Sequence, residues 1–261
     1  ALTAVTTGES NTAVGFNAGA ALTTGGFNVA VGRQALLSTT TVNDNVAVGN
    51  NALRLNTTGA NNTGIGSSSL DANTTGVRNV AVGALALSSN TTANDNVAVG
   101  GGTSGVSFAA LQSNTTGANN TAVGNGALGA NTTASANSAF GYSALLDNTT
   151  GAANTALGKD ALRANTTGDY NIAVGTDCLT ANTTGDSNTA MGLDAMLTNT
   201  TGNYNTAVGA LALTNGNHSY NAAFGYQALK ASTSGQQNTA IGYQSCVALT
   251  TALYNSALGL Q

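Results

Sequence analysis

The chain has 261 residues, of which only six are Lys or Arg and ten are Asp or Glu, with one histidine, no proline and no tryptophan. So few groups able to act as, or to tune, an acid or base argue against an enzyme, and a net charge of −4 without a basic stripe argues against a nucleic-acid partner. An apolar fraction of 41% argues against disorder, while no apolar run reaches the roughly 18 residues that a membrane span needs.

One motif, Asn-x-Ala-Val-Gly with close variants, recurs fifteen times, and its closing glycine runs from Gly15 to Gly259. Twelve of the fourteen intervals between these glycines are 17 residues, one is 24 and one is 16. The consensus, seen at 158–174, is Gly-x-x-Ala-Leu-x-x-Asn-Thr-Thr-Gly-x-x-Asn-Thr-Ala-Val. We therefore expect a single repeat domain over 1–261, with an insertion within 101–109 and a one-residue deletion near 210–220.

The unit favours short strands over helix, because Asn, Thr and Gly dominate where a helix needs Leu, Glu and Lys. We expect two strands in each repeat, one at Asn-Thr-Ala-Val and one around Ala-Leu, joined by corners of Gly and Asn. The predicted fold is an all-β parallel β-solenoid, or β-roll, of about fifteen coils. At roughly 4.8 Å per coil, it would form a rod on the order of 70 Å long.

The columns of the repeat predict which side chains face inward. Asparagine, alanine and the closing glycine share one face of the first strand, and the interior ladder of asparagines is expected at Asn62, Asn79, Asn96, Asn120, Asn154, Asn171, Asn188 and Asn205. The other face carries an apolar column that is expected to form a seam between chains: Val14, Val31, Val48, Ile65, Val82, Val99, Val123, Phe140, Leu157, Val174, Met191, Val208, Phe224, Ile241 and Leu258.

Aromatic residues flank this predicted seam in two further columns. One column holds Phe27, Tyr170, Tyr204, Tyr220 and Tyr254, and the other holds Phe16, Tyr142, Tyr226 and Tyr243. The opposite arrangement, with valine inside and alanine and asparagine outside, is the alternative, and it would give a monomer that needs no partner.

Nine Asn-Thr-Thr triplets, the first at Asn56, match the acceptor pattern for N-glycosylation. Glycans on successive coils would collide, so we interpret the triplets as rows of asparagine and threonine that stabilise the stacking. The threonine column beginning at Thr57 and Thr74 also suggests a different function, because regular threonine rows on a flat face can bind ice.

The seven extra residues of the insertion lie at a corner and leave the repeat in phase on both sides. We expect a protruding loop, with Thr103, Ser104, Val106 and Phe108 as candidate binding residues. A neutral insertion without a binding role is the alternative.

Asp160, Asp177 and Asp194 occupy one column in successive coils, and Asp169 and Asp186 form a second. Stacked carboxylates repel unless they are solvated or bridged by a cation such as Ca²⁺. Because the glycine-rich signature of calcium-binding β-rolls is absent, a solvated edge is favoured over a metal site, and no cofactor is expected. Arg54 and Asp71 are expected to pair at the surface.

Cys178 and Cys246 replace the alanine and the leucine of their coils and lie four coils apart, too far for a disulfide within the chain. We interpret them as small core or seam residues. His218 lies in the shortened coil without a second metal-ligating side chain nearby, and we interpret it as a turn residue.

The core segment, as in Asn238-Thr239-Ala240-Ile241-Gly242, resembles the head repeats of YadA-type trimeric autotransporter adhesins. The longer 17-residue form is similar to repeats of phage and algal-virus tail-fibre-like proteins. The adhesin resemblance implies a left-handed parallel β-roll, three copies of which associate about a fibre axis, although the adhesin repeats are shorter than 17 residues.

The predicted function is therefore a structural or adhesive segment of an extracellular fibre, at a cell surface or on a virion, with ice binding as the alternative. The expected partners are further copies of the chain, as a homotrimer with end-to-end association into a filament, and a surface receptor or glycan. The chain begins and ends in register with the repeat, as a piece of a longer fibre would, or a rod with covered ends.

Overall fold

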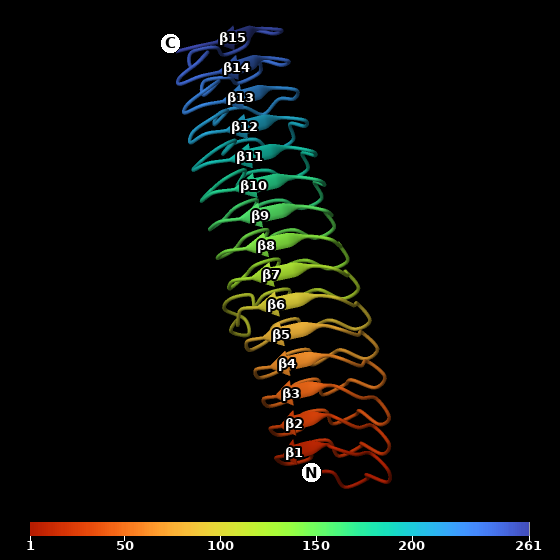
Figure 1. Ribbon diagram of the computed structural model, residues 1–261. Coiled ribbons are helices and arrows are strands. Elements are labelled where there is room, and N and C mark those ends of the chain that lie inside the picture. Colours follow the sequence, from red (N-terminus) through yellow and green to blue (C-terminus); the bar gives the residue numbers. More distant parts are fainter. Residues whose placement is uncertain (261) are drawn as a thin grey trace. The chain divides into compact units, whose positions relative to one another are not determined.

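The computed structural model describes residues 1–260, and all of its strands are short and parallel. Two compact units, Ala1–Ala136 and Asn137–Gln261, are distinguished. Figure 1 shows one strand in each coil. The strands of the first unit are β1 Thr12–Val14, β2 Val29–Val31, β3 Val46–Val48, β4 Thr63–Ile65, β5 Val80–Val82, β6 Val97–Val99 and β7 Thr121–Val123.

The second unit continues the same pattern. Its strands are β8 Ser138–Phe140, β9 Thr155–Leu157, β10 Ile172–Val174, β11 Thr189–Met191, β12 Thr206–Val208, β13 Ala222–Phe224, β14 Thr239–Ile241 and β15 Ser256–Leu258. Within each unit every strand pairs with the next strand of the chain in the register of the repeat, as in Thr189↔Thr206 and Ala190↔Ala207. The prediction of an all-β parallel β-solenoid of about fifteen coils is confirmed.

The prediction of a second strand around Ala-Leu is wrong, because this segment forms turns. In most coils the leucine has a left-handed backbone, with φ of 50° at Leu53 and 51° at Leu162. The chain thus bends where a strand was expected. Each of these leucines is fully buried, and its backbone N–H still bonds to the next coil, as from Leu53 N to the Ser69 carbonyl at 3.0 Å.

Burial places alanine and asparagine inside and the valine column outside. The central alanine of nearly every strand is fully buried, whereas Val14 and Leu157 are 60% and 50% exposed. The alternative with valine inside is therefore wrong. All eight asparagines named for the interior ladder, from Asn62 to Asn205, are buried.

The closing glycine is required by the stacking. Gly158 has a φ of 140°, which L-residues with a side chain rarely adopt, and a Cβ there would meet the backbone carbonyl of Gly175 in the next coil. The same approach recurs from Gly32 to Gly49. The repeat of this glycine therefore reflects backbone packing between coils.

Candidate functional site

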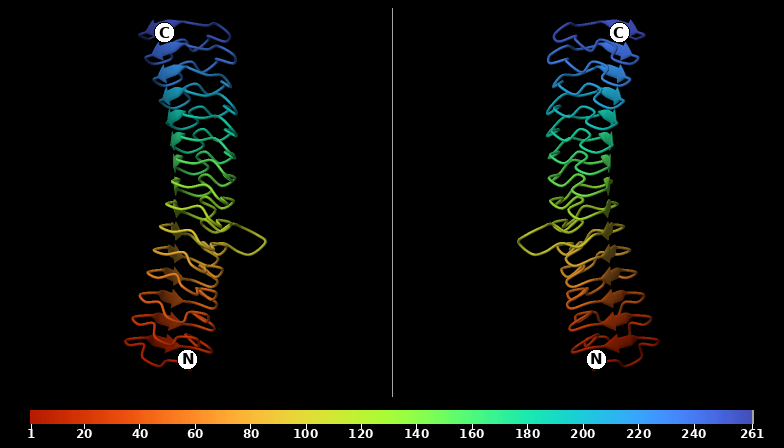
Figure 2. Two further views of the ribbon diagram at one scale, coloured as in Figure 1. Left: turned by 90° about the vertical axis from the view of Figure 1, so that its right-hand side faces the viewer. Right: turned by 90° about the vertical axis from the view of Figure 1, so that its left-hand side faces the viewer.

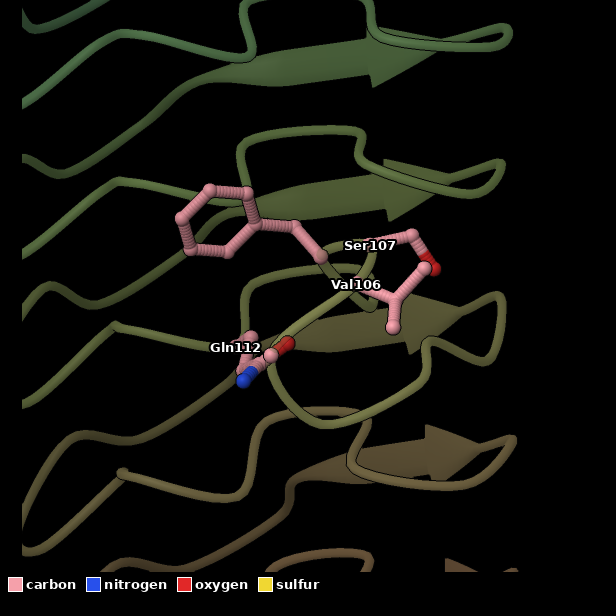
Figure 3. Close-up of a pocket in the computed structure, with 5 residues that line it drawn as sticks. Val106, Ser107 and Gln112 are labelled. Atoms are coloured by element: carbon pink, nitrogen blue, oxygen red, sulfur yellow. The ribbon is translucent and has the colours of Figure 1, made fainter.

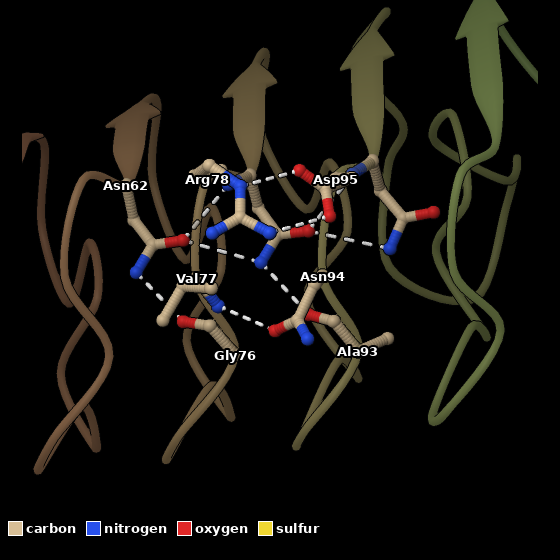
Figure 4. A network of polar contacts seen from close by, with 9 residues as sticks. Asn62, Gly76, Val77, Arg78, Ala93, Asn94 and Asp95 are labelled. Atoms are coloured by element: carbon tan, nitrogen blue, oxygen red, sulfur yellow. Dashed lines mark hydrogen bonds and ion pairs between the residues drawn. The ribbon is translucent and has the colours of Figure 1, made fainter.

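Two asparagine ladders hold the coils together. In the first, the Asn79 backbone N–H donates to the Asn62 Oδ1 at 3.0 Å, and the Asn79 amide donates to the Ala93 carbonyl at 2.8 Å. This ladder ties each strand to the coils on both sides. Figure 4 shows part of this ladder beside the surface residues Arg78 and Asp95.

The second ladder consists of the asparagines of the nine Asn-Thr-Thr triplets, all of them buried. The Asn165 amide donates to the Asn148 Oδ1 at 2.8 Å and to the Gly168 carbonyl at 2.9 Å, and Asn182 donates in turn to Asn165 at 2.8 Å. The amides of these sequons are therefore structural groups inside the fold, in agreement with their interpretation as stacking rows.

The two threonines of each triplet have different environments. In most triplets the first threonine donates its hydroxyl to the backbone of the next coil, as from Thr166 Oγ1 to the Thr183 carbonyl at 3.0 Å. The second threonine is exposed in every triplet, as at Thr167. Only one column of threonine hydroxyls is thus left to face solvent at this corner.

His218 replaces a ladder member in the shortened coil. Gly216 stands at the ladder position, and the buried imidazole of His218 lies against it. Its Nδ1 accepts from the Asn221 amide at 2.8 Å, and its Nε2 lies 3.2 Å from the Ser232 carbonyl, which accepts its proton. Burial lowers the pKa of His218, so the neutral ring with a proton on Nε2 fits the site. The interpretation as a turn residue missed this core role.

Cys178 is fully buried, and burial raises the pKa of its thiol to about 12. Cys246 is half-buried, and both thiols are free. A thiol held in its neutral form is a poor nucleophile, so Cys178 serves as a small core residue.

The aspartate columns differ from each other. Asp160 is buried and its Oδ2 lies 2.8 Å from Lys159 Nζ, whereas Asp177 and Asp194 are half-buried. Within residues 1–260, no group of three or more His, Cys, Asp or Glu side chains is arranged to hold a metal ion. In the second column the carboxylates accept backbone bonds between coils, from Asp169 N to the Asp186 Oδ1 at 2.8 Å.

Two arginines form bidentate pairs with aspartates one coil ahead. Arg54 Nε lies 2.8 Å from the Asp71 Oδ1, and Arg78 Nε lies 2.6 Å from the Asp95 Oδ1 (Figure 4). The hydrogen bond from Arg78 lowers the pKa of the Asp95 carboxyl. Only the first pair was expected, although both have a spacing of 17 residues.

The insertion protrudes from its coil as a hairpin (Figure 2). Thr103 and Ser107 exchange backbone hydrogen bonds of 3.1 and 3.0 Å, and Val106 at its tip is 83% exposed. A hollow of about 290 Å³ lies beside Val106, Phe108 and Gln112 (Figure 3). Its lining residues, Gly105, Val106, Ser107, Phe108 and Gln112, include no charged group. Of the predicted binding residues, Val106 and Phe108 line this hollow, while Thr103 and Ser104 do not.

The predicted seam residues all lie at the outward third position of their strands. The larger ones are well exposed, as at Met191 (43%) and Ile241 (41%). The first strand position also faces outward and holds Thr, Val, Ile, Ser or Ala. The third position is therefore apolar in every strand, whereas the first is Thr or Ser in nine of the fifteen. That another chain covers this face stays a prediction.

Comparison with known proteins identifies no similar protein. No family model matches the chain, and neither a curated protein nor a solved structure is similar to it. Among residues 1–260 there is no helix long and apolar enough to cross a membrane.

Proposed function

We propose that the chain is a structural and adhesive segment of an extracellular fibre, at a cell surface or on a virion. One observation carries the proposal: each coil combines a nearly invariant buried set with variable exposed columns. Ala161, Leu162 and Asn165 stand for the buried set, and the neighbouring Lys159 and Tyr170 belong to exposed columns that hold other residue types in other coils. A scaffold that displays side chains at fixed spacing combines a constant core with variable exposed positions in this way.

The outward apolar column supports self-association as a homotrimer. An outward apolar side chain, exposed or half-buried, occupies the third strand position of every coil, where a solvated sheet face would carry polar residues. A second and third copy that cover this face would remove the column from water. End-to-end association and binding to a surface receptor or glycan belong to the same proposal.

Sedimentation equilibrium tests the association. The expected mass is three times that of the 25.4 kDa chain. The double variant Leu157→Lys with Met191→Lys places charges in the column and should give monomers, because burying two unpaired ammonium groups per chain is costly. The matched control, Thr167→Lys with Thr184→Lys, charges the exposed threonine corner and should stay trimeric. A monodisperse wild-type monomer would overturn the seam.

Ice binding is the second candidate, and the exposed column of second threonines favours it. Against it, the first threonine of most triplets donates its hydroxyl to the backbone of the next coil. Thermal hysteresis decides between the two: ice shaping by a monomer would support this candidate and contradict the fibre.

The proposal assigns no catalytic role. The buried imidazole of His218 has both nitrogens engaged in the core, and the Cys178 thiol is neutral at physiological pH. We also propose no nucleic-acid partner, because the six basic residues are scattered along the chain and several are paired with aspartates.

A further inference from the structure

A column of exposed tyrosines in the second unit is interrupted at one coil. The position two residues before each strand holds Tyr170, Ser187, Tyr204, Tyr220, Gln237 and Tyr254 in successive coils. These residues share a left-handed backbone, with φ between 57° and 65° wherever a tyrosine or Ser187 stands. The tyrosines and Ser187 donate their N–H to the coil before, as from Ser187 N to the Asp169 carbonyl at 2.9 Å and from Tyr204 N to the Asp186 carbonyl at 3.1 Å.

Adjacent tyrosines in this column stack on each other. The ring centroids of Tyr204 and Tyr220 are 5.3 Å apart, with 13° between the ring planes. Ser187 has no ring, so the positions of Tyr170 and Tyr204 are two coil steps, or about 9.6 Å, apart, and rings oriented as in the Tyr204 and Tyr220 pair would leave an open slot between them. A ring placed midway would lie about 4.8 Å from each tyrosine, within the range of stacked contacts. Tyr170 and Tyr204 are 67% and 56% exposed, so the slot opens to solvent.

Two carboxylates are next in sequence to residues of this slot. Asp169 and Asp186 precede Tyr170 and Ser187, are half-buried, and each accepts a backbone N–H at Oδ1, with distances of 2.6 Å from Ala152 and 2.8 Å from Asp169. The second oxygen of each carboxylate is left as an acceptor. No Lys or Arg of residues 1–260 lies within ion-pair distance of either carboxylate.

We propose that this slot binds a pyranose ring of a glycan. Tyr170 and Tyr204 would stack against the two apolar faces of the sugar, and Ser187 with the Oδ2 atoms of Asp169 and Asp186 would accept and donate hydrogen bonds at its hydroxyls. Sites for small ligands usually combine apolar walls with a small number of polar groups at fixed positions. A puckered sugar ring is thicker than a flat guanidinium, and two coil steps suit the thicker group.

The other interruption of the column provides an internal control. Gln237 lies between Tyr220 and Tyr254, but the residues that precede these three are Ser219, Gln236 and Leu253. No Asp or Glu precedes the residues of this second gap, and glutamine has a longer side chain than serine. The two gaps therefore have matched walls and different chemistry.

The experiment is saturation-transfer NMR on the full chain with the methyl glycosides of glucose, galactose, mannose and N-acetylglucosamine, and with argininamide as the flat cation. Transfer to the ring protons of at least one glycoside is expected. Ser187→Tyr fills the slot with a ring that this backbone position already accepts at Tyr170 and Tyr204, and it should reduce the transfer at least tenfold. Gln237→Tyr should leave it unchanged.

Tyr170→Ala removes one wall and should also reduce transfer severalfold, with the fold checked by circular dichroism. Absence of transfer to every glycoside would overturn the proposal, as would transfer that persists in Ser187→Tyr. Argininamide binding that depends on Ser187, without glycoside binding, would assign the slot to a cation instead. The glycan site rests on the proposed function and specifies which residues would bind the glycan, while sedimentation tests the fibre separately, so either can fail alone.

Discussion

At the scale of single residues, the buried asparagine amides form the side-chain hydrogen bonds that connect one coil to the next. Asn165 takes part in three hydrogen bonds of its ladder and is fully buried. A neutral amide has both donors and an acceptor, so identical residues can stack without repulsion. A column of aspartates in the same place would place like charges next to each other.

Asn165→Ala should therefore be strongly destabilising. It removes three buried hydrogen bonds and leaves one Asn182 amide donor without its acceptor, and a buried unsatisfied group costs about 1 to 3 kcal/mol. We expect the free energy of unfolding to fall by about 3 kcal/mol or more in urea titration. Thr167→Ala in the same coil, at an exposed site, should change it by less than about 0.5 kcal/mol. Equal losses in the two variants would show that the buried ladder contributes no more to the free energy of unfolding than an exposed threonine does.

His218 makes stability depend on pH. Its pKa is lowered in the fold, so the unfolded chain, with a histidine pKa of about 6.5, binds the proton more tightly. The stabilisation is complete above about pH 6.5 and is lost as pH falls through the folded-state pKa. Protonation of Nδ1 would also remove the acceptor for the Asn221 amide.

We expect the midpoint of urea unfolding to decline from pH 7.5 to pH 5.5 in the wild type. In His218→Gln this decline should be much weaker, because the titrating imidazole is gone. A parallel decline in both proteins would assign the effect to other groups.

At the scale of elements, the repeat period predicts most of the coil but not its turns. The buried alanine column and the first asparagine ladder follow from alternation in the strand around Ala190 and Asn188. The left-handed leucines do not, because a bulky residue at positive φ is unfavourable by about 1 to 2 kcal/mol in isolation. Burial of a side chain such as Leu162 offsets this with about 2 to 3 kcal/mol, a tertiary effect that local propensity does not contain.

The candidate site was predictable only in part for the same reason. The aromatic columns are visible in the sequence, but the slot at Ser187 depends on the stacking distance of Tyr204 and Tyr220. Likewise, the role of His218 becomes clear only when Gly216 is seen to vacate a ladder position. A single sequence gives the period of a column, and the contacts between columns come from the fold.

The corner of this coil occurs twice, once before the hairpin and once after it. Gly102 N donates to the Ala84 carbonyl of the coil before, whereas the Phe108 carbonyl accepts from Gly126 N of the coil after. The strands on either side, β6 and β7, keep the ordinary register. The loop is therefore an addition to a coil that is otherwise complete.

Deletion of Thr103 to Ala109 should restore a 17-residue coil, with Gly101 and Gly102 at the corner. We expect the free energy of unfolding to change by less than about 1 kcal/mol, because closing a loop of this length costs little. Deletion of the seven residues 128–134 instead removes the buried Leu128 and Asn131 and should unfold the first unit. Circular dichroism and thermal melting compare the two variants, and a collapse of the first would show that the hairpin supports the coil.

At the scale of the whole molecule, the nine Asn-Thr-Thr triplets restrict the route by which the chain can be made. N-glycosylation modifies the asparagine amide, and the nine acceptor amides lie inside the fold as ladder members. A glycan attached before folding would keep its asparagine out of the ladder. A chain exported through a glycosylating pathway should therefore fail to fold.

Secretion from a eukaryotic cell line tests this directly. We expect the wild type to be glycosylated and retained or aggregated, while expression in a cytoplasm without glycosylation gives folded protein. A variant with alanine at the nine second threonines, Thr58, Thr75, Thr92, Thr116, Thr133, Thr150, Thr167, Thr184 and Thr201, removes the acceptor pattern at exposed positions and leaves the ladder intact. It should be secreted folded, with glycans only at exposed sequons such as those of Asn61 and Asn119. Folded, secreted wild type with glycans on the ladder asparagines would contradict the burial of these amides.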